Sequence, residues 1–320
     1  MFSVNQEAVR IVREKIIPRA EELNCKVIRL ANGATVIDMG VEVPGGWLAG
    51  QLFVEATIGG LGQACFGRFS LGAIDLPSID VYIDHPQEAC LSSQFSGWKL
   101  PGKDIPGYII PIGSGPARAI ARNDIFAQAW SYKDIHHAAV FAAQTTELPD
   151  ASLAESIAEA CQIPVENVYI LAARTGSLVG SIQVCSRTVE ASMWRMVRKG
   201  FDISKVISGM GSCPIPPPIR DELKAMDRTN TSLLYGGMVR YVVDCTDEEI
   251  EQVIDQLPLS ASRLFGTPFL ELFEAADRDF YKVDKDIHTI AFYEIMNVSS
   301  GRTFRAGQLR EDMLKQSLFD

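Results

Sequence analysis

Apolar and polar positions follow helical and strand-like periods along most of the chain. Residues 5–24 predict an amphipathic helix, and the β-prone runs 26–30 and 34–39 flank Asn32-Gly33, which predicts a hairpin. Further strands are predicted at 79–83, 108–112, 137–146 and 167–173, and helices at 86–98 and 150–161, the last capped by Asp150 or Ser152. Strands that alternate with helices predict an α/β architecture.

The pattern changes beyond residue 200. The proline-rich stretch 213–219 predicts an extended connector, because prolines cannot continue a helix interior or a central strand. Gly236-Gly237, between the runs 232–235 and 238–243, predicts another hairpin. Late strands are predicted at 280–283, 289–298 and 303–305, with a turn at 299–301. We expect two tightly packed α/β lobes, a larger one at 1–200 and a smaller α+β one at 201–320.

The segment 180–199 carries the most informative polar pattern. It predicts a helix that opens after a small-residue turn at Gly176, Gly180 and Ser181. Its apolar stripe consists of Ile182, Val189, Met193, Met196 and Val197, and a second band consists of Gln183, Arg187, Glu190 and Trp194. A carboxylate held by its own arginine is a candidate base. The alternative is a surface ion pair worth a few tenths of a kcal/mol, and spacing alone leaves both open.

Three other segments carry candidate ligand contacts. Residues 113–119 predict a strand-to-helix junction whose free amides, with Arg118, favour an anion; a tight turn with a helix cap is the alternative. No Gly-Lys-Ser/Thr follows, so this is not a Walker A loop. Residues 92–98 either edge a cleft for a flat heterocycle or end a helix with Trp98 in the core. Residues 228–230 carry polar groups into the predicted hairpin, where a turn network is the other interpretation.

Composition narrows the classes of function. The chain has 320 residues and a formal net charge of −10, which argues against general nucleic-acid binding. No segment approaches the ~18–20 uninterrupted apolar residues of a membrane span, and the N-terminus lacks signal-peptide features, so we expect a cytoplasmic protein. Seven cysteines without a C-x-x-C pair, and four histidines without H-x-x-x-H spacing, predict neither a disulfide framework nor a metal site.

Taken together and in this order, the motifs resemble the methenyltetrahydromethanopterin cyclohydrolase family. The matching strings are Gly-Ser-Gly-Pro-Ala-Arg-Ala at 113–119, Gly-Ser-Ile-Gln-Val-Cys-Ser-Arg-Thr-Val-Glu at 180–190, Arg-Thr-Asn-Thr-Ser-Leu-Leu-Tyr-Gly-Gly at 228–237, and Thr-Pro-Phe with Asp-Phe-Tyr-Lys-Val-Asp within 267–284. The resemblance spans nearly the whole chain.

The resemblance implies hydrolysis of the cyclic amidinium of methenyltetrahydromethanopterin, or its dephospho form, to the formyl pterin. It implies a substrate pocket between two α/β lobes, no metal or prosthetic group, and a homo-oligomer, of which a trimer is one form. The family's catalytic Arg-x-x-Glu pair falls on Arg187 and Glu190. Predicted substrate contacts are Gly113, Ser114, Gly115, Arg118, Gln144, Ser181, Gln183 and Asn230. The alternative function is a non-catalytic pterin-binding paralogue or scaffold protein of the same pathway.

Three positions depart from the family pattern. Gln144 stands where the family carries a glutamate, Arg174 stands where it carries a proline, and residues 288–291 read His-Thr-Ile-Ala where it has Phe-Ala-Pro-Ala. The first two changes make the local field more positive, which disfavours a cationic substrate carbon. We therefore expect Arg174 to point toward the ligand's distal end or an acidic neighbour, with Gln144 acting only as a hydrogen-bond partner.

Overall fold

The computed structural model describes residues 2–103, 105 and 108–319. Its described part contains two six-stranded sheets together with helices, so the predicted α/β class is confirmed. Backbone contacts divide the chain into two compact units. Unit 1 comprises residues 1–62, 88–183 and 218–222, and unit 2 comprises residues 63–87, 184–217 and 223–320. The segments of the two units alternate along the chain, and the sequence-based division near residue 200 stays a prediction.

The sheet of unit 1 is mixed and has its parallel strands at the centre. Its order is β1 (Lys26–Arg29), β2 (Thr35–Gly40), β8 (Val168–Ala173), β7 (Ala139–Gln144), β6 (Ile112–Ser114) and β5 (Trp98–Lys99). β2, β8 and β7 are parallel, whereas β1, β6 and β5 pair antiparallel. The predicted hairpin at Asn32-Gly33 is confirmed by the β1–β2 pairing. The strand predicted at 108–112 is wrong for most of its length, because pairing starts only at Ile112.

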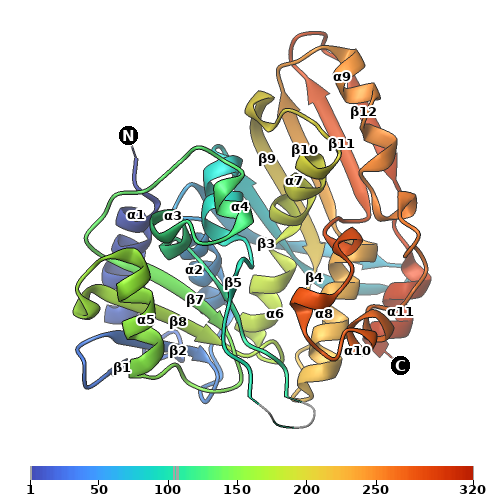
Figure 1. Ribbon diagram of the computed structural model, residues 1–320. Helices are drawn as coiled ribbons and strands as arrows, with labels where there is room; N and C mark the ends of the chain where they lie inside the picture. The colour runs from blue at the N-terminus through green and yellow to red at the C-terminus, as the bar shows by residue number, and fades with distance from the viewer. Residues whose placement is uncertain (1, 104, 106–107, 320) are drawn as a thin grey trace. The chain divides into compact units, whose positions relative to one another are not determined.

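Helices cover both faces of this sheet (Figure 1). One face packs on the opening segment, which runs from α1 (Val4–Arg10) through a π-helical stretch (Ile11–Ile16) and a 3-10 turn (Ile17–Arg19), and on α2 (Trp47–Thr57). The other face packs on α3 (Ala117–Ala121) and α5 (Ala151–Cys161). Strands buried on both sides explain why β7 and β8 are apolar at nearly every position.

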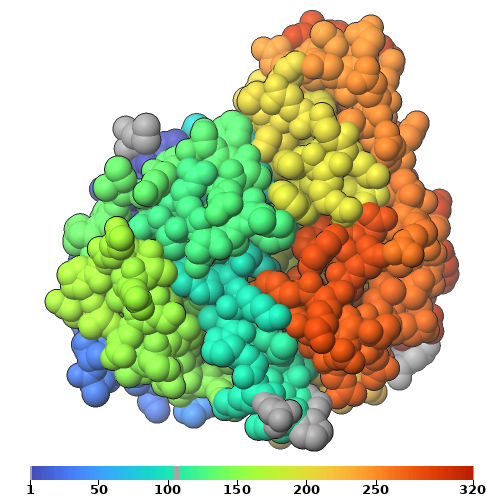
Figure 2. Space-filling model, viewed as in Figure 1, coloured from blue at the N-terminus to red at the C-terminus, as the bar shows by residue number. Residues whose placement is uncertain are grey.

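The helix α5 shows how its sequence fixes its ends. The Asp150 side chain accepts a hydrogen bond from Leu153 N, which confirms the predicted N-cap. Ala154, Ile157, Ala158 and Cys161 are buried, at the spacing of one helix face. The opposite face lies at the surface of unit 1, where the yellow-green atoms of this segment are visible in Figure 2. The short helix predicted at 86–98 forms as a π-helical segment over Gln87–Gln94, and α4 (Ile125–Gln128) follows α3.

The sheet of unit 2 is mostly antiparallel. Its order is β12 (Thr303–Gly307), β11 (Phe292–Asn297), β10 (Met238–Val243), β9 (Val206–Pro214), β4 (Ile74–Ile83) and β3 (Gly62–Leu71). Only the β10–β11 pair among those with a described register is parallel. The late strands at β11 and β12 and the turn between them confirm the prediction. β9, β10 and β11 are visible side by side in Figure 1.

Three predictions for unit 2 are wrong. Residues 232–235 are not a hairpin strand but the last turn of α8 (Glu222–Gly236), which leads directly into β10. Residues 280–283 contain a 3-10 turn (Phe280–Lys282) rather than a strand. Cys213 and Pro214 end the central strand β9, so the proline-rich connector starts later than predicted. Pro214 is tolerated there because it is the terminal residue of the strand.

The remaining α-helices of unit 2 are short. They are α7 (Thr188–Arg198), α9 (Asp247–Glu251), α10 (Phe269–Ala275) and α11 (Glu311–Phe319). Of these, α7 packs on β9 and β10. Among the described residues, no helix is long and apolar enough to cross a membrane.

Candidate active site

The single helix predicted at 180–199 is two helices in the structure. The candidate catalytic pair lies at the break between them and at the start of the second helix. α6 spans Leu178–Cys185, so Gly180 and Ser181 lie inside a helix rather than in a turn before it. Residues 186 and 187 form a turn, and Arg187 is the N-cap residue of α7. Glu190 therefore lies in the first turn of a new helix, where the helix dipole favours a carboxylate.

The Arg187–Glu190 ion pair is buried. Arg187 Nη1 donates to Glu190 Oε2 at 2.9 Å, and the two residues are 7% and 4% exposed. The interpretation as a surface ion pair is therefore wrong. Removing two charges from water costs more than a pair between neighbouring residues regains unless the geometry is good, so burial of such a pair is weak evidence for a stabilising role. A carboxylate held in a fixed position beside a guanidinium is a candidate base, although structural ion pairs have the same arrangement.

The predicted apolar stripe of this region is confirmed at four of its five positions. Ile182, Val189, Met193 and Met196 are fully buried, and Val197 is partly exposed. The pattern did not predict Arg195, which is also buried. Its Nη1 donates to Asp286 Oδ1 at 2.9 Å and its Nε donates to the Gln256 carbonyl at 3.1 Å. Arg195 thus connects α7 to two later 3-10 turns of unit 2, Ile254–Gln256 and Lys285–Ile287.

Three of the predicted substrate-binding residues meet in unit 1. Gln183 Nε2 donates to Gln144 Oε1 at 3.0 Å, and Gln144 Nε2 donates to Thr175 Oγ1 at 2.7 Å. Ser181 Oγ donates to the Thr175 carbonyl at 3.2 Å. Thr175 therefore links Gln144, at the end of β7, to α6. The prediction that Gln144 serves as a hydrogen-bond partner agrees with these contacts.

Arg174 lies beside an acidic neighbour, which confirms one of the two orientations predicted for it. Its Nε donates to Glu222 Oε1 at 2.7 Å, and its Nη2 donates to the Arg220 carbonyl at 2.5 Å. The same Glu222 oxygen accepts from Gly176 N at 3.1 Å. The positive charge that Arg174 adds is thus compensated within unit 1.

The glycine-rich junction at 113–118 forms where the sequence predicts it. Gly113 and Ser114 belong to β6, which pairs with β7 beside Gln144. Gly115 has φ +97°, a conformation that favours glycine, and its N–H donates to the Ser93 carbonyl at 3.0 Å. A Cβ atom at Gly113 would lie 2.4 Å from the Phe141 ring, so the strand also requires glycine for packing.

Arg118 has partners within its own unit. It is fully buried, and its Nε and Nη2 donate to the two oxygens of Asp124 at 2.8 and 2.6 Å. Its Nη1 donates to the Ser93 carbonyl at 2.9 Å. Asp124 also caps α4 by accepting from Phe126 N and Ala127 N. These contacts account for Arg118 as a structural residue, and binding of an anion by this loop stays a prediction.

Two further residues singled out from the sequence have local partners. Asn230 lies on α8 in unit 2, and its Nδ2 donates to the Met226 carbonyl one turn earlier, at 2.8 Å. His288 is buried and stacks on Phe280 with ring centroids 5.9 Å apart. Burial, assisted by the charges of Lys285 and Arg198, lowers the pKa of His288 to about 3, so the ring is neutral at physiological pH.

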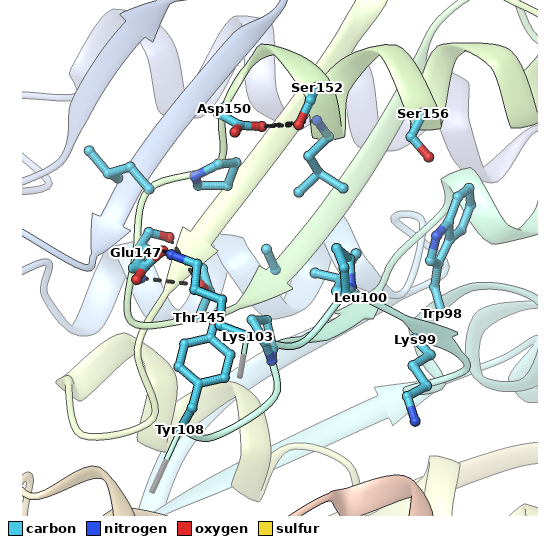
Figure 3. A pocket seen from close by; sticks show the side chains of 16 residues that line it. Trp98, Lys99, Leu100, Lys103, Tyr108, Thr145, Glu147, Asp150, Ser152 and Ser156 are labelled. Atoms are coloured by element: carbon cyan, nitrogen blue, oxygen red, sulfur yellow. Dashed lines mark hydrogen bonds and ion pairs between the residues drawn. The ribbon is translucent and has the colours of Figure 1, made fainter. Parts of the chain in front are cut away.

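A pocket of about 370 Å³ opens in unit 1 at the end of β7 and the start of α5 (Figure 3). Its described lining contains none of the predicted catalytic or substrate-binding residues, but it includes Trp98 from the candidate segment 92–98. Lys103 pairs with Glu147 and lies 5.9 Å from the centroid of the Tyr108 ring. The hydrogen bond to Glu147 raises the pKa of Lys103, and burial raises the pKa of Tyr108. Trp98 and Leu100 add apolar surface, so the pocket combines apolar and charged walls.

The described residues include no group of three or more His, Cys, Asp or Glu side chains arranged to hold a metal ion. Sequence reasoning missed two residues that complete these networks, Thr175 and Asp124. Thr175 follows a strand and faces a helix, and Asp124 precedes a short helix as an N-cap. The role of Asp124 as the N-cap of α4 could have been predicted from the local sequence. The hydrogen bonds of Thr175 could not, because their partners lie on segments far away in the sequence.

The fold and these networks define an α/β protein with a buried arginine–carboxylate pair at the start of a helix. Residues 3–318 match the family described as Cyclohydrolase (MCH). The chain is 40% identical to the methenyltetrahydromethanopterin cyclohydrolase of Methanocaldococcus jannaschii, with 99% of this chain and 98% of the relative covered. Proteins of the same name from Methanospirillum hungatei and Methanothermobacter marburgensis are 36% and 39% identical, with 99% of each chain covered. This chain belongs to the methenyltetrahydromethanopterin cyclohydrolase family.

Proposed function

We propose that this protein is a methenyltetrahydromethanopterin cyclohydrolase. The observation that carries the proposal is the buried Arg187–Glu190 pair in a chain that matches the cyclohydrolase family almost from end to end. The relatives' shared name supplies the substrate, a pterin with a methenyl bridge. The buried pair supplies a carboxylate that can take a proton.

The proposed reaction needs one base and no external electrophile. The bridging carbon of the substrate is already cationic, because it belongs to an amidinium. Water adds to that carbon and forms a C–O bond, while Glu190 accepts the water proton. The added hydroxyl group then loses its proton as the C=O bond forms, one C–N bond breaks with its electron pair on nitrogen, and that nitrogen takes up a proton to give the formyl pterin. The net reaction consumes one water molecule and releases one proton.

Arg187 has two tasks in this proposal. Its hydrogen bond at 2.9 Å fixes the rotamer of Glu190, and its positive charge lies directly beside the carboxylate. Orientation of the base is a large part of what an enzyme contributes to such a step, since a misplaced group loses most of its effective concentration.

The substrate-binding set remains part of the proposal. The Gln144–Thr175–Gln183 network offers amide and hydroxyl groups of the kind that bind pterin edges. Ser181, Gly113, Ser114, Gly115, Arg118 and Asn230 are proposed with it on the resemblance.

Three further properties are proposed on the resemblance and the chemistry. The enzyme acts in the cytoplasm, requires no metal or prosthetic group, and forms a homo-oligomer. Activity that survives dialysis against a chelator would support the second property. The mass of the purified protein in solution tests the third.

The proposed function is tested by adding purified protein to methenyltetrahydromethanopterin and following the loss of the amidinium absorbance. We expect a rate proportional to protein concentration and a formyl pterin as the product, identified by mass spectrometry. A Glu190→Gln preparation made in parallel controls for host enzymes. Substrate binding without turnover would favour the non-catalytic paralogue, and neither binding nor turnover would reject the pterin assignment.

A further inference from the structure

The first turn of α7 lies against a strand that has no side chains at the point of contact. A Cβ atom at Gly211 would lie 1.8 Å from Thr188 Oγ1 and 2.9 Å from Thr188 Cβ. A Cβ atom at Gly209 would lie 3.0 Å from Val189 Cγ1. Glycine inside a strand weakens the strand, so its use at both β9 positions is explained by this close approach of helix and sheet.

The contact at Gly211 is steric. Thr188 is buried, and its hydroxyl has no hydrogen-bond partner among the residues that the structure describes. The threonine therefore fills space against the bare backbone of β9. Any shift of the helix start toward the sheet is blocked by this contact.

A pair of hydroxyl groups holds the same turn from the neighbouring strand. Tyr241 on β10, opposite Gly209 in the sheet register, is fully buried and its Oη donates to the Val189 carbonyl at 2.9 Å. Ser192 Oγ lies 2.7 Å from that Oη and 2.6 Å from the Thr188 carbonyl. Both carbonyls belong to the first helical turn, which therefore cannot rotate or slide without losing buried hydrogen bonds.

We propose that Tyr241 is a positioning residue for the proposed reaction, and that it acts with Gly209 and Gly211 to fix the first turn of α7. The proposal rests on the proposed function, because its consequence is the location of the Glu190 carboxylate, one residue beyond Val189. A displacement of a reacting group by 1 Å can cost about a hundredfold in rate. The proposed role of Tyr241 runs through the Val189 carbonyl and requires no contact with the substrate.

The first test compares two buried tyrosines. Tyr241→Phe removes the hydroxyl that holds α7, whereas Tyr293→Phe removes an equally buried hydroxyl, on β11, that lies 2.9 Å from Thr289 Oγ1. We expect Tyr241→Phe to lower kcat at least about tenfold while KM changes less than about twofold. Tyr293→Phe should lower the thermal stability of the protein about as much as Tyr241→Phe does, but it should keep kcat within about twofold of the wild-type value.

A second measurement separates failure of this proposal from failure of the proposed function. Amide hydrogen exchange over residues 188–193 needs no substrate, and it should be faster in Tyr241→Phe than in Tyr293→Phe. If the wild-type protein has no turnover, the proposed function fails while the exchange rates still decide whether Tyr241 fixes the turn. Equal kcat and equal exchange in the two variants would overturn the positioning role.

The steric half of the proposal has its own test. Gly211→Ala should lower kcat more than Tyr241→Phe, because the added methyl group displaces Thr188. Thr188→Ala in the Gly211→Ala background removes the atom 1.8 Å from that methyl group and should restore part of the lost kcat. Losses that simply multiply in the double variant would contradict a direct contact.

Discussion

Two buried arginine–carboxylate pairs with similar sequence signals differ in what they join. Arg118 meets Asp124 through two hydrogen bonds and the Ser93 carbonyl through a third, so it connects three separate segments of unit 1. Arg187 and Glu190 are neighbours on one helical turn in unit 2, so their ion pair closes no loop between distant segments. The bonds of Arg118 thus hold separate segments of unit 1 together, whereas the bond between Arg187 and Glu190 joins residues that are already neighbours along the chain.

The difference shows how to distinguish a structural charge from a candidate functional one. Both motifs contain a turn, an arginine and the start of a helix. What separates them is how far apart along the chain the bonded groups lie. Asp124 caps α4 while it binds Arg118, whereas Glu190 lies in the first turn of the helix that Arg187 precedes.

The largest expected effect is on turnover. Glu190→Gln keeps the size of the side chain but cannot accept the proton of the attacking water, so kcat should fall about a hundredfold to ten-thousandfold. Substrate affinity should change far less. Steady-state rates and a binding titration on the same preparation measure both quantities.

The matched control for Glu190→Gln is Glu248→Gln. Glu248 is an exposed glutamate in the first turn of α9, so its substitution makes the same chemical change at a similar helix position. We expect it to leave kcat unchanged. A Glu190→Gln variant that turned over as fast as Glu248→Gln would assign the base to another residue.

The second prediction concerns stability. Arg118→Ala leaves the Asp124 carboxylate buried without its cation, which should lower the free energy of unfolding by about 3–5 kcal/mol. Urea denaturation measures this loss. The double variant Arg118→Ala, Asp124→Ala should be less destabilised than the sum of the single variants. A stable Arg118→Ala protein with weakened, salt-sensitive substrate binding would instead support the anion site predicted from the sequence.

A third arginine, Arg195, extends the comparison to the pH dependence of stability. Burial acts to raise the pKa of Asp286, but the charge and hydrogen bond of Arg195 outweigh burial and hold that pKa below its ordinary value of 3.8. A carboxyl with a lowered folded-state pKa stabilises the protein above the unfolded pKa, and this stability is lost as pH falls through the folded value. Asp286→Asn should cost about 1 kcal/mol at neutral pH.

The pH dependence of the stability loss in Asp286→Asn is the control for that prediction. The difference in unfolding free energy between wild type and Asp286→Asn should shrink at pH values below 3.8, where the wild-type carboxyl becomes protonated. Urea titrations at neutral and acidic pH measure it. A difference that stayed constant across this range would show that the side chain contributes through packing rather than charge.

The smallest expected effect is at Gln144. Gln144→Glu can still accept from Gln183, and Thr175 can reverse its hydroxyl to donate to the new carboxylate. Turnover should therefore change by less than about tenfold, the equivalent of one ordinary hydrogen bond. A large gain would show that the glutamine had moved this chain away from the family reaction.

The sequence predicted the elements whose signals are local. The Asn32-Gly33 hairpin, the Asp150 cap and the buried strands β7 and β8 all depend on neighbouring residues. Gly236-Gly237 misled because paired glycines end helices as well as hairpin strands, and α8 runs directly into β10. The break at residue 187 was missed because the apolar stripe continues across it.

The candidate site was predictable only in part for the same reason. Arg187 and Glu190 are close in sequence, and their pairing was readable from spacing. Three other features depend on strand pairing between residues far apart along the chain. They are the burial of this pair, the hydrogen bond between Gln144 on β7 and Gln183 on α6, and the contact of α7 with Gly211. No periodicity within one segment contains that information.

The pairing of β4 with β9 has a consequence for synthesis of the chain. β4 ends at Ile83 and its partner strand begins at Val206. At about 5–20 residues per second, the ribosome needs roughly 6–25 seconds to make the intervening stretch of about 120 residues. During that time the β3–β4 segment has been synthesised but β9, the neighbour of β4 in the sheet, has not, so the backbone edge of β4 is open to other chains. Nascent protein in a crowded cell can thus pair wrongly at the free edge of β4 until Val206 emerges, and a chaperone that binds exposed strands would act in that interval.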